Sequence, residues 1–174
     1  MIRRFYNYYL SPKKELARKL KSVLGFVPDN MHLFKLAFFH KSMNNVDPEE
    51  YNYNNERLEF LGDVILSSIV SETLYHRNKN DDEGELSKKR ERIVSRKNLN
   101  EKAKSVFKQE WLKHKAKNIT DNMYGDFLEA LIGGIYLEKG YEKTKEFVLK
   151  NIIDKNVLGV MLSCVSPENF EKNL

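Results

Sequence analysis

The stretch NNERLEFLGDVIL, residues 54–66, carries three acids, Glu56, Glu59 and Asp63, at helical spacing. At about 100° of rotation per residue, these side chains fall within an arc of about 60° on one face of a helix. The other positions are mostly apolar, which is typical of a largely buried helix. Carboxylates that face one another in a partly dry site repel and lose hydration, unless a cation compensates their charge.

A second stretch, MYGDFLEALIGGIYL at residues 123–137, repeats this arrangement with Asp126 and Glu129. If the two acidic faces meet, they form a site whose oxygen ligands suit a hard cation such as Mg²⁺. The alternative is an apolar pair of core helices in which the acids are incidental. Five acids at facing helical spacings disfavour that alternative.

Helix breakers are few, with four prolines and eight glycines among 174 residues, and the chain is therefore predicted to form one all-α domain. Gly62, Gly133 and Gly134 lie inside the two acidic helices, where each costs about 1 kcal/mol relative to Ala. We expect close approach of the two helices to compensate. In chain order, helices are expected over about residues 12–23, capped by Ser11, and after residue 30. Further helices are expected over about 56–77, from residue 85, near 103–111, from residue 121 to Gly140, and over about 141–153.

The chain is basic, with a net charge of +5, and two stretches hold most of the positive charge. Residues 1–23 contain seven Lys and Arg against one Glu, and residues 88–117 contain twelve against three. Such concentrations indicate a polyanionic partner. The alternative is that these lysines merely solvate helix faces, and the neighbouring acidic cluster favours the nucleic-acid interpretation.

The sequence also bears on the cellular compartment. The single cysteine, Cys164, excludes a disulfide within the chain and fits a reducing compartment. No apolar run approaches the roughly 20 residues that a membrane span needs, so we expect a cytoplasmic protein with no membrane partner. Residues 1–10 alternate basic and aromatic side chains. A helix packed onto the domain is the favoured interpretation of this segment, and a weakly membrane-seeking end is the alternative.

Four motifs resemble the ribonuclease III family, whose members cleave double-stranded RNA. NERLEFLGD at residues 55–63 is similar to the family signature, and FHKS at 39–42 to the element before it. EGELSKKRERIVS at 83–95 and GDFLEALIGGIYLEKG at 125–140 complete the set. The motifs span about residues 30–150 in the order and approximate spacing of the family.

The resemblance implies a divalent-metal site, with Mg²⁺ as the usual ion, Mn²⁺ as a substitute, and two ions per site when substrate is bound. The implied ligands are Glu59, Asp63, Asp126 and Glu129. Asp63 and Glu129 are implied to be the pair on which catalysis depends most. Glu56 matches the first acid of the signature but stays outside the implied metal shell, and whether it serves a neighbouring subunit or the RNA is left open.

The resemblance further implies an all-α ribonuclease III endonuclease domain that forms a symmetric homodimer, with the signature helix at the interface. Each of the two sites would cut one strand of the duplex, leaving staggered ends with 5′-phosphate and 3′-hydroxyl groups. The implied role is processing of ribosomal and other structured RNA precursors. From charge density and position, we predict RNA-backbone contacts by Lys88, Lys89, Arg96 and Lys97.

We expect three segments. Residues 1–25 are expected to form a basic N-terminal helix packed on the domain, residues 26–155 the catalytic domain, and residues 156–174 a linker or tail. No double-stranded-RNA-binding domain is recognisable after the catalytic segment. This fits either a catalytic domain separated from a longer protein or a natural stand-alone nuclease.

Two other functions remain compatible with parts of the sequence. A catalytically silent relative could serve as an RNA scaffold, but the intact set of carboxylates argues against it. A metal hydrolase acting on a small phosphorylated substrate could use a similar acidic cluster, but the signature and the basic stretches argue against that. His40, a lone histidine before a polar loop, is expected to be a hydrogen-bonded structural residue.

Overall fold

The computed structural model describes residues 2–43, 54–115 and 121–153, and these residues form helices and connecting turns, which confirms the predicted all-α class. Within the described part of the chain, Phe39 and Lys113 form an isolated parallel β-bridge. The elements are α1 (Ile2–Tyr9), α2 (Lys14–Leu24), α3 (Met31–Ala37), η1 (Lys41–Met43), α4 (Glu56–Arg77), α5 (Glu83–Val94), α6 (Arg96–Val106), η2 (Gln109–Trp111) and α7 (Asp121–Asn151).

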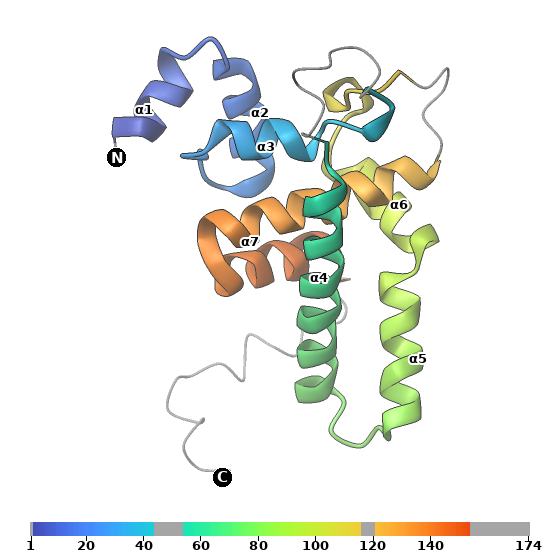
Figure 1. Cartoon of the computed structure of the whole chain (residues 1–174). Helices are drawn as coiled ribbons and strands as arrows, with labels where there is room; N and C mark the ends of the chain where they lie inside the picture. Colours follow the sequence, from blue (N-terminus) through green and yellow to red (C-terminus); the bar gives the residue numbers. More distant parts are fainter. Residues whose placement is uncertain (1, 44–53, 116–120, 154–174) are drawn as a thin grey trace.

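Helices α4 and α7 form the centre of the molecule. Figure 1 shows α4 as one long helix, with α7 packed against it, α5 returning alongside it, and α1 to α3 gathered at one end. The core joins fully buried residues of α4, such as Leu66 and Ile69, to Phe127 and Leu131 of α7. The two acidic stretches therefore belong to the two helices that pack at the heart of the fold.

Glycines let the backbones of α4 and α7 approach closely. A Cβ atom at Gly62 would lie 1.8 Å from the backbone oxygen of Glu129, and one at Gly133 would lie 2.3 Å from that of Leu58. The expectation of close approach is confirmed at these two positions. It is wrong for Gly134, where a Cβ atom would meet only side-chain atoms at ordinary contact distance, 3.9 Å or more.

Helix boundaries follow the sequence prediction along most of the described chain. Helix α4 occupies the expected residues, and Asn30 caps α3 by accepting a hydrogen bond from the backbone N–H of Leu33. Gly140, with φ of 74°, interrupts α7 at the predicted position because this left-handed conformation suits glycine. The segment expected after Gly140 forms the second part of α7.

The N-terminal segment differs in part from the prediction. Residues 1–25 hold two helices, α1 and α2, which agrees with the helices expected within residues 1–10 and over 12–23, although the three-segment division described residues 1–25 as one basic helix. Ser11 does not cap a helix that starts at Pro12; its hydroxyl accepts a hydrogen bond from the N–H of Lys13 within the turn, and α2 begins after that turn. The predicted tail at 156–174, with Cys164, lies outside the described residues.

None of the helices in the described ranges is both long enough and apolar enough to cross a membrane.

Candidate metal centre

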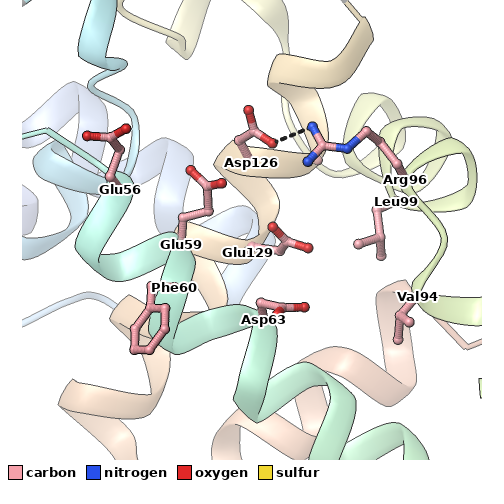
Figure 2. A pocket seen from close by; sticks show the side chains of 10 residues that line it. Glu56, Glu59, Phe60, Asp63, Val94, Arg96, Leu99, Asp126 and Glu129 are labelled. Carbon is pink, nitrogen blue, oxygen red and sulfur yellow. Dashed lines mark hydrogen bonds and ion pairs between the residues drawn. The ribbon is translucent and has the colours of Figure 1, made fainter. Parts of the chain in front are cut away.

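The five acids of the two predicted stretches line one cleft. The cleft has a volume of about 480 Å³ and lies between α4, the connection from α5 to α6, and the start of α7 (Figure 2). The acids are Glu56, Glu59, Asp63, Asp126 and Glu129. The approach of α4 to α7 at Gly62 explains this arrangement, because the backbone oxygen of Glu129 lies directly against that glycine.

Three of the acids form a tight group. One carboxylate oxygen from each of Glu59, Asp126 and Glu129 lies within 4.8 Å of the other two. Oxygen ligands lie at about 2.0–2.6 Å from Mg²⁺ or Ca²⁺, so two ligands of one ion can be separated by at most roughly 4–5 Å. The spacing of the three carboxylates is therefore compatible with one shared cation.

Asp63 lies one turn further along α4 and is exposed at the cleft. It is outside the tight group, although its charge acts on Glu129, as described below. The structure therefore brings together three of the four residues predicted to bind metal and places the fourth beside them.

Glu56 is set apart from the other acids. Its carboxylate accepts hydrogen bonds from Lys41 Nζ at 3.0 Å and Asn54 Nδ2 at 3.2 Å. The hydrogen bond from Lys41 holds the pKa of Glu56 below its ordinary value. These contacts agree with leaving Glu56 out of the predicted metal shell. Lys41 was not singled out from the sequence, since no periodic pattern relates it to α4.

Glu129 shows how strongly the acids act on one another. Burial, followed by the negative charges of Asp63, Glu59 and Asp126, raises the pKa of Glu129 to about 8. Burial and the charge of Asp126 also raise the pKa of Glu59. Such shifts mean that the cleft has more negative charge than its surroundings compensate. A divalent cation would relieve this excess, so the donor set fits a hard metal ion.

Arg96 lies inside the cleft. Its guanidinium Nη1 donates a hydrogen bond of 3.0 Å to Asp126 Oδ1, drawn as the dashed line in Figure 2. Ser95 caps α6 by accepting from the N–H of Asn98, which places Arg96 at the first position of that helix, facing α7. The sequence indicated Arg96 as a cation but not this acidic partner, which lies 30 residues further along the chain.

The other three predicted RNA contacts lie outside the cleft. Lys88 and Lys97 are exposed to solvent, and Lys89 forms an ion pair with Asp81. The cleft lining includes none of them. A role for these lysines in RNA binding remains a prediction.

His40 has hydrogen-bonded neighbours of its own. Its Nδ1 accepts a hydrogen bond from the backbone N–H of Ser42 at 3.1 Å and lies 3.0 Å from the hydroxyl of the same residue. Burial lowers the pKa of His40, which favours the neutral ring. The prediction of a hydrogen-bonded histidine is confirmed.

Comparison with known proteins gives a consistent family. A family model described as Ribonuclease-III-like matches residues 30–156. A Ribonuclease 3 from Flavobacterium psychrophilum is 40% identical over 137 residues, which cover 78% of this chain and 56% of that protein. A Ribonuclease 3 from Azobacteroides pseudotrichonymphae is 43% identical over 148 residues, covering 84% and 56% respectively. The chain thus spans little more than half the length of these curated relatives.

Solved structures show the same similarity in three dimensions. The nuclease domain of ribonuclease III from Campylobacter jejuni, in which a flexible region is involved in dimer formation, matches with a TM-score of 0.70 and 35% identity. That match covers 79% of this chain and 96% of the C. jejuni chain. Dicer from Pichia stipitis matches with a TM-score of 0.55 and 27% identity, over 70% of this chain and 53% of that one.

Proposed function

Because this chain belongs to the ribonuclease-III-like family, we propose that it is a metal-dependent endoribonuclease that hydrolyses phosphodiester bonds of double-stranded RNA. The observation that carries the proposal is the grouping of Glu59, Asp126 and Glu129 within 4.8 Å of one another in an open cleft. A phosphodiester is itself anionic, so an acidic cleft suits it only when cations bridge the two.

Glu59, Asp63, Asp126 and Glu129 are the proposed ligands of Mg²⁺, for which Mn²⁺ can substitute, and two ions are proposed when RNA is bound. When bound, the metal supplies charge neutralisation at the phosphate and activation of water. Burial and neighbouring charges keep Glu129 largely protonated near neutral pH in the absence of metal, since its pKa is about 8. Glu129 therefore gives up a proton when it becomes a ligand.

Asp63 and Glu129 are proposed as the catalytic pair. They come from different helices, α4 and α7, whose relative position is set by backbone contact at Gly62 and Gly133. Both line the same cleft. A site held by packed helices keeps its carboxylates in place as substrate enters, which favours an efficient reaction.

The substrate is proposed to be duplex RNA, held through its phosphates by Arg96 and the exposed residues Lys88, Lys89 and Lys97. A-form RNA is recognised mainly by shape, phosphates and 2′-hydroxyls, so little base specificity is expected. The products would be staggered ends with 5′-phosphate and 3′-hydroxyl groups. Processing of ribosomal and other structured RNA precursors in the cytoplasm is the proposed role.

We propose a symmetric homodimer with α4 at the interface. Phe60 and Val64 are large apolar residues on α4 that remain exposed in the single chain, and Phe60 also lines the cleft. Exposed apolar residues of this kind are typical of protein interfaces. Pairing through α4 would place one acidic cleft on each side of the interface, so that each cleft can act on one strand.

The proposed reaction is tested with a substrate panel of one long duplex RNA, one of its single strands and mononucleotides, each with Mg²⁺ at low salt. The wild-type chain should cut the duplex to 5′-phosphate ends, and Glu129→Gln should abolish cutting. Glu142→Gln, the same change at an exposed position of α7, is the control and should cut normally. Hydrolysis of mononucleotides alone would point to a small-substrate hydrolase, and duplex binding without cutting by the wild type would point to a scaffold.

A further inference from the structure

Helix α1 presents an apolar face to solvent. Figure 1 places this helix at an outer corner of the molecule, with α2 and α3 on one side of it. At about 100° per residue, Ile2, Phe5, Tyr6 and Tyr9 fall within an arc of about 100°, and Leu10 follows directly. Their exposed fractions are 87% for Ile2, 58% for Phe5, 48% for Tyr6, 53% for Tyr9 and 66% for Leu10.

The opposite, polar face of α1 packs on the domain. Asn7 is only 7% exposed, and its Nδ2 donates hydrogen bonds to the backbone oxygens of Pro28 at 2.9 Å and Asp29 at 3.2 Å. Arg4 donates to the Asp29 carboxylate at 2.8 Å. A surface helix normally packs through its apolar face, so α1 is oriented the other way round.

Several contacts fix α1 in this orientation. Asp29, the partner of Arg4, also accepts a hydrogen bond from Lys139 of α7 at 3.1 Å. Helix α1 also contacts α2 through Tyr8, whose ring lies under two cations. Lys21 Nζ is 4.5 Å and the Arg18 guanidinium 5.7 Å from the centroid of that ring. The outward apolar face is therefore held by contacts of α1 to α2 and to the turn before α3, and that turn is itself linked to α7 through Asp29.

Positive charge borders the apolar face at one edge and at its C-terminal end. Residues 1–23 carry seven Lys and Arg against one Glu. Arg3 lies about 60° around the helix from Tyr6, and Lys13 and Lys14 follow the last apolar residue; all three cations are exposed. Apolar and aromatic side chains bordered by cations are the composition of helices that lie in the headgroup region of anionic membranes.

We propose that this apolar face, Ile2, Phe5, Tyr6, Tyr9 and Leu10 of α1 and the turn after it, binds the surface of an anionic lipid bilayer. The helix would lie in the plane of the headgroups and would not span the bilayer. Surface binding of this kind replaces the expectation, based on the lack of a long apolar run, that the protein has no membrane partner. No residue of α1 lines the acidic cleft, so membrane binding through α1 would not require the proposed nuclease activity.

Other occupants fit the face less well. An eight-residue helix is about 12 Å long, which is short for a contact between copies that must bury about 800 Å² on each partner to be stable. Single-stranded RNA needs open ring faces for base stacking, whereas Phe5 and Tyr9 pack on each other with centroids 4.8 Å apart. Ile2 and Leu10, the two most exposed members, have no ring on which a base could stack.

The test is co-sedimentation of the 174-residue chain with vesicles of phosphatidylcholine alone or with roughly one third phosphatidylglycerol. The wild type should partition onto the anionic vesicles at least about tenfold more strongly than onto the neutral ones. Replacing both Phe5→Ser and Tyr9→Ser should lower that partitioning by about tenfold or more. Tyr75→Ser, which removes an aromatic side chain that is 67% exposed on α4, is the matched control and should bind as the wild type does.

Each alternative occupant gives a different result. Equal vesicle binding by the wild type and the double variant, or no binding by either, would overturn the proposal. The proposal would also be overturned if neither protein bound vesicles and the double variant lost binding to single-stranded RNA. The same holds if neither bound vesicles and the double variant lost a larger oligomeric mass that the wild type shows. Unchanged thermal unfolding of the double variant, expected because both side chains are exposed, excludes misfolding as the cause.

Discussion

The carboxyl group of Glu129 is surrounded by other acids and only partly reached by water. Because its pKa in the folded state is raised to about 8, the folded protein favours the protonated form. The resulting stabilisation is complete below the ordinary carboxyl pKa and is lost as the pH rises through about 8. In the absence of metal, the free energy of unfolding should therefore fall between pH 5 and pH 9.

Glu129→Gln should remove much of this pH dependence. In metal-free buffer at pH 8.5 or above, we expect the variant to unfold with a free energy higher than that of the wild type by an amount on the order of a few kcal/mol. Near pH 4 the two should be alike. Urea unfolding at the two pH values measures the difference, with Glu142→Gln as the control. A variant that is less stable than the wild type at high pH would contradict this electrostatic description.

The guanidinium of Arg96 binds the carboxylate of Asp126, which would otherwise be available to a metal ion. Arg96→Gln removes the hydrogen bond to Asp126 and leaves more negative charge in the cleft. We expect Mn²⁺ to bind the variant more tightly, by a factor on the order of several-fold, as measured by calorimetry without RNA. Lys97→Gln, the same loss of charge at the next, solvent-exposed position, should change Mn²⁺ affinity much less. Equal affinities for all three proteins would show that Arg96 does not compete with the ion.

At the scale of the elements, the position of α4 against α7 rests on two glycines. Gly133→Ala would place a Cβ atom 2.3 Å from the backbone oxygen of Leu58, so the helices must separate. We expect a loss of about 2 kcal/mol or more in the free energy of unfolding, with a loss of cleavage because the acids move apart. Chemical denaturation and duplex cleavage measure the two effects.

The adjacent glycine provides the control for that change. At Gly134 a Cβ atom would make ordinary contacts, at 3.9 Å or more. Gly134→Ala should therefore be neutral or stabilise the protein by up to about 1 kcal/mol through helix propensity. If both substitutions destabilise equally, the close approach is not the reason for the glycine at position 133.

Helical periodicity was sufficient to predict α4 and its acidic face, which lines the cleft together with the acids of α7. The spacing of Glu56, Glu59 and Asp63 requires only a helix, and the apolar positions beside them specify which side is buried. Contacts between distant residues could not be predicted in this way. Asn7 bonds to Pro28, 21 residues away, and this contact orients α1 against its own amphipathic pattern.

For the site, the carboxylate set followed from motifs, but its internal order did not. Which three acids come closest depends on the packing of α4 on α7, and the pairing of Arg96 with Asp126 depends on how α6 meets α7. The need for glycine at position 134 was predicted wrongly, because neighbouring glycines in a helix face different directions and only one of them faces α4.

At the scale of the whole molecule, the basic stretch of the sequence at residues 88–117 contributes Arg96 to the lining of the acidic cleft. If the exposed Lys88 and Lys97 contact RNA phosphates, replacing both with Gln should weaken duplex binding and reduce the slope of log affinity against log salt by about 1 to 2. Fluorescence anisotropy in EDTA at several salt concentrations measures both. Replacing Lys143 and Lys150, on the second part of α7, with Gln provides the control. If the slope changes equally for both pairs of substitutions, a specific role for Lys88 and Lys97 is ruled out.

The proposed activity depends above all on a divalent ion that binds in the acidic cleft and takes part in cutting duplex RNA. The most direct test is the rate of cleavage of one long duplex as a function of Mg²⁺ concentration, for the wild type and Glu129→Gln. We predict a saturable dependence on Mg²⁺ for the wild type, no cleavage in EDTA, and no cleavage by the variant at any Mg²⁺ concentration. Cleavage in EDTA, or equal rates for the two proteins, would contradict the claim.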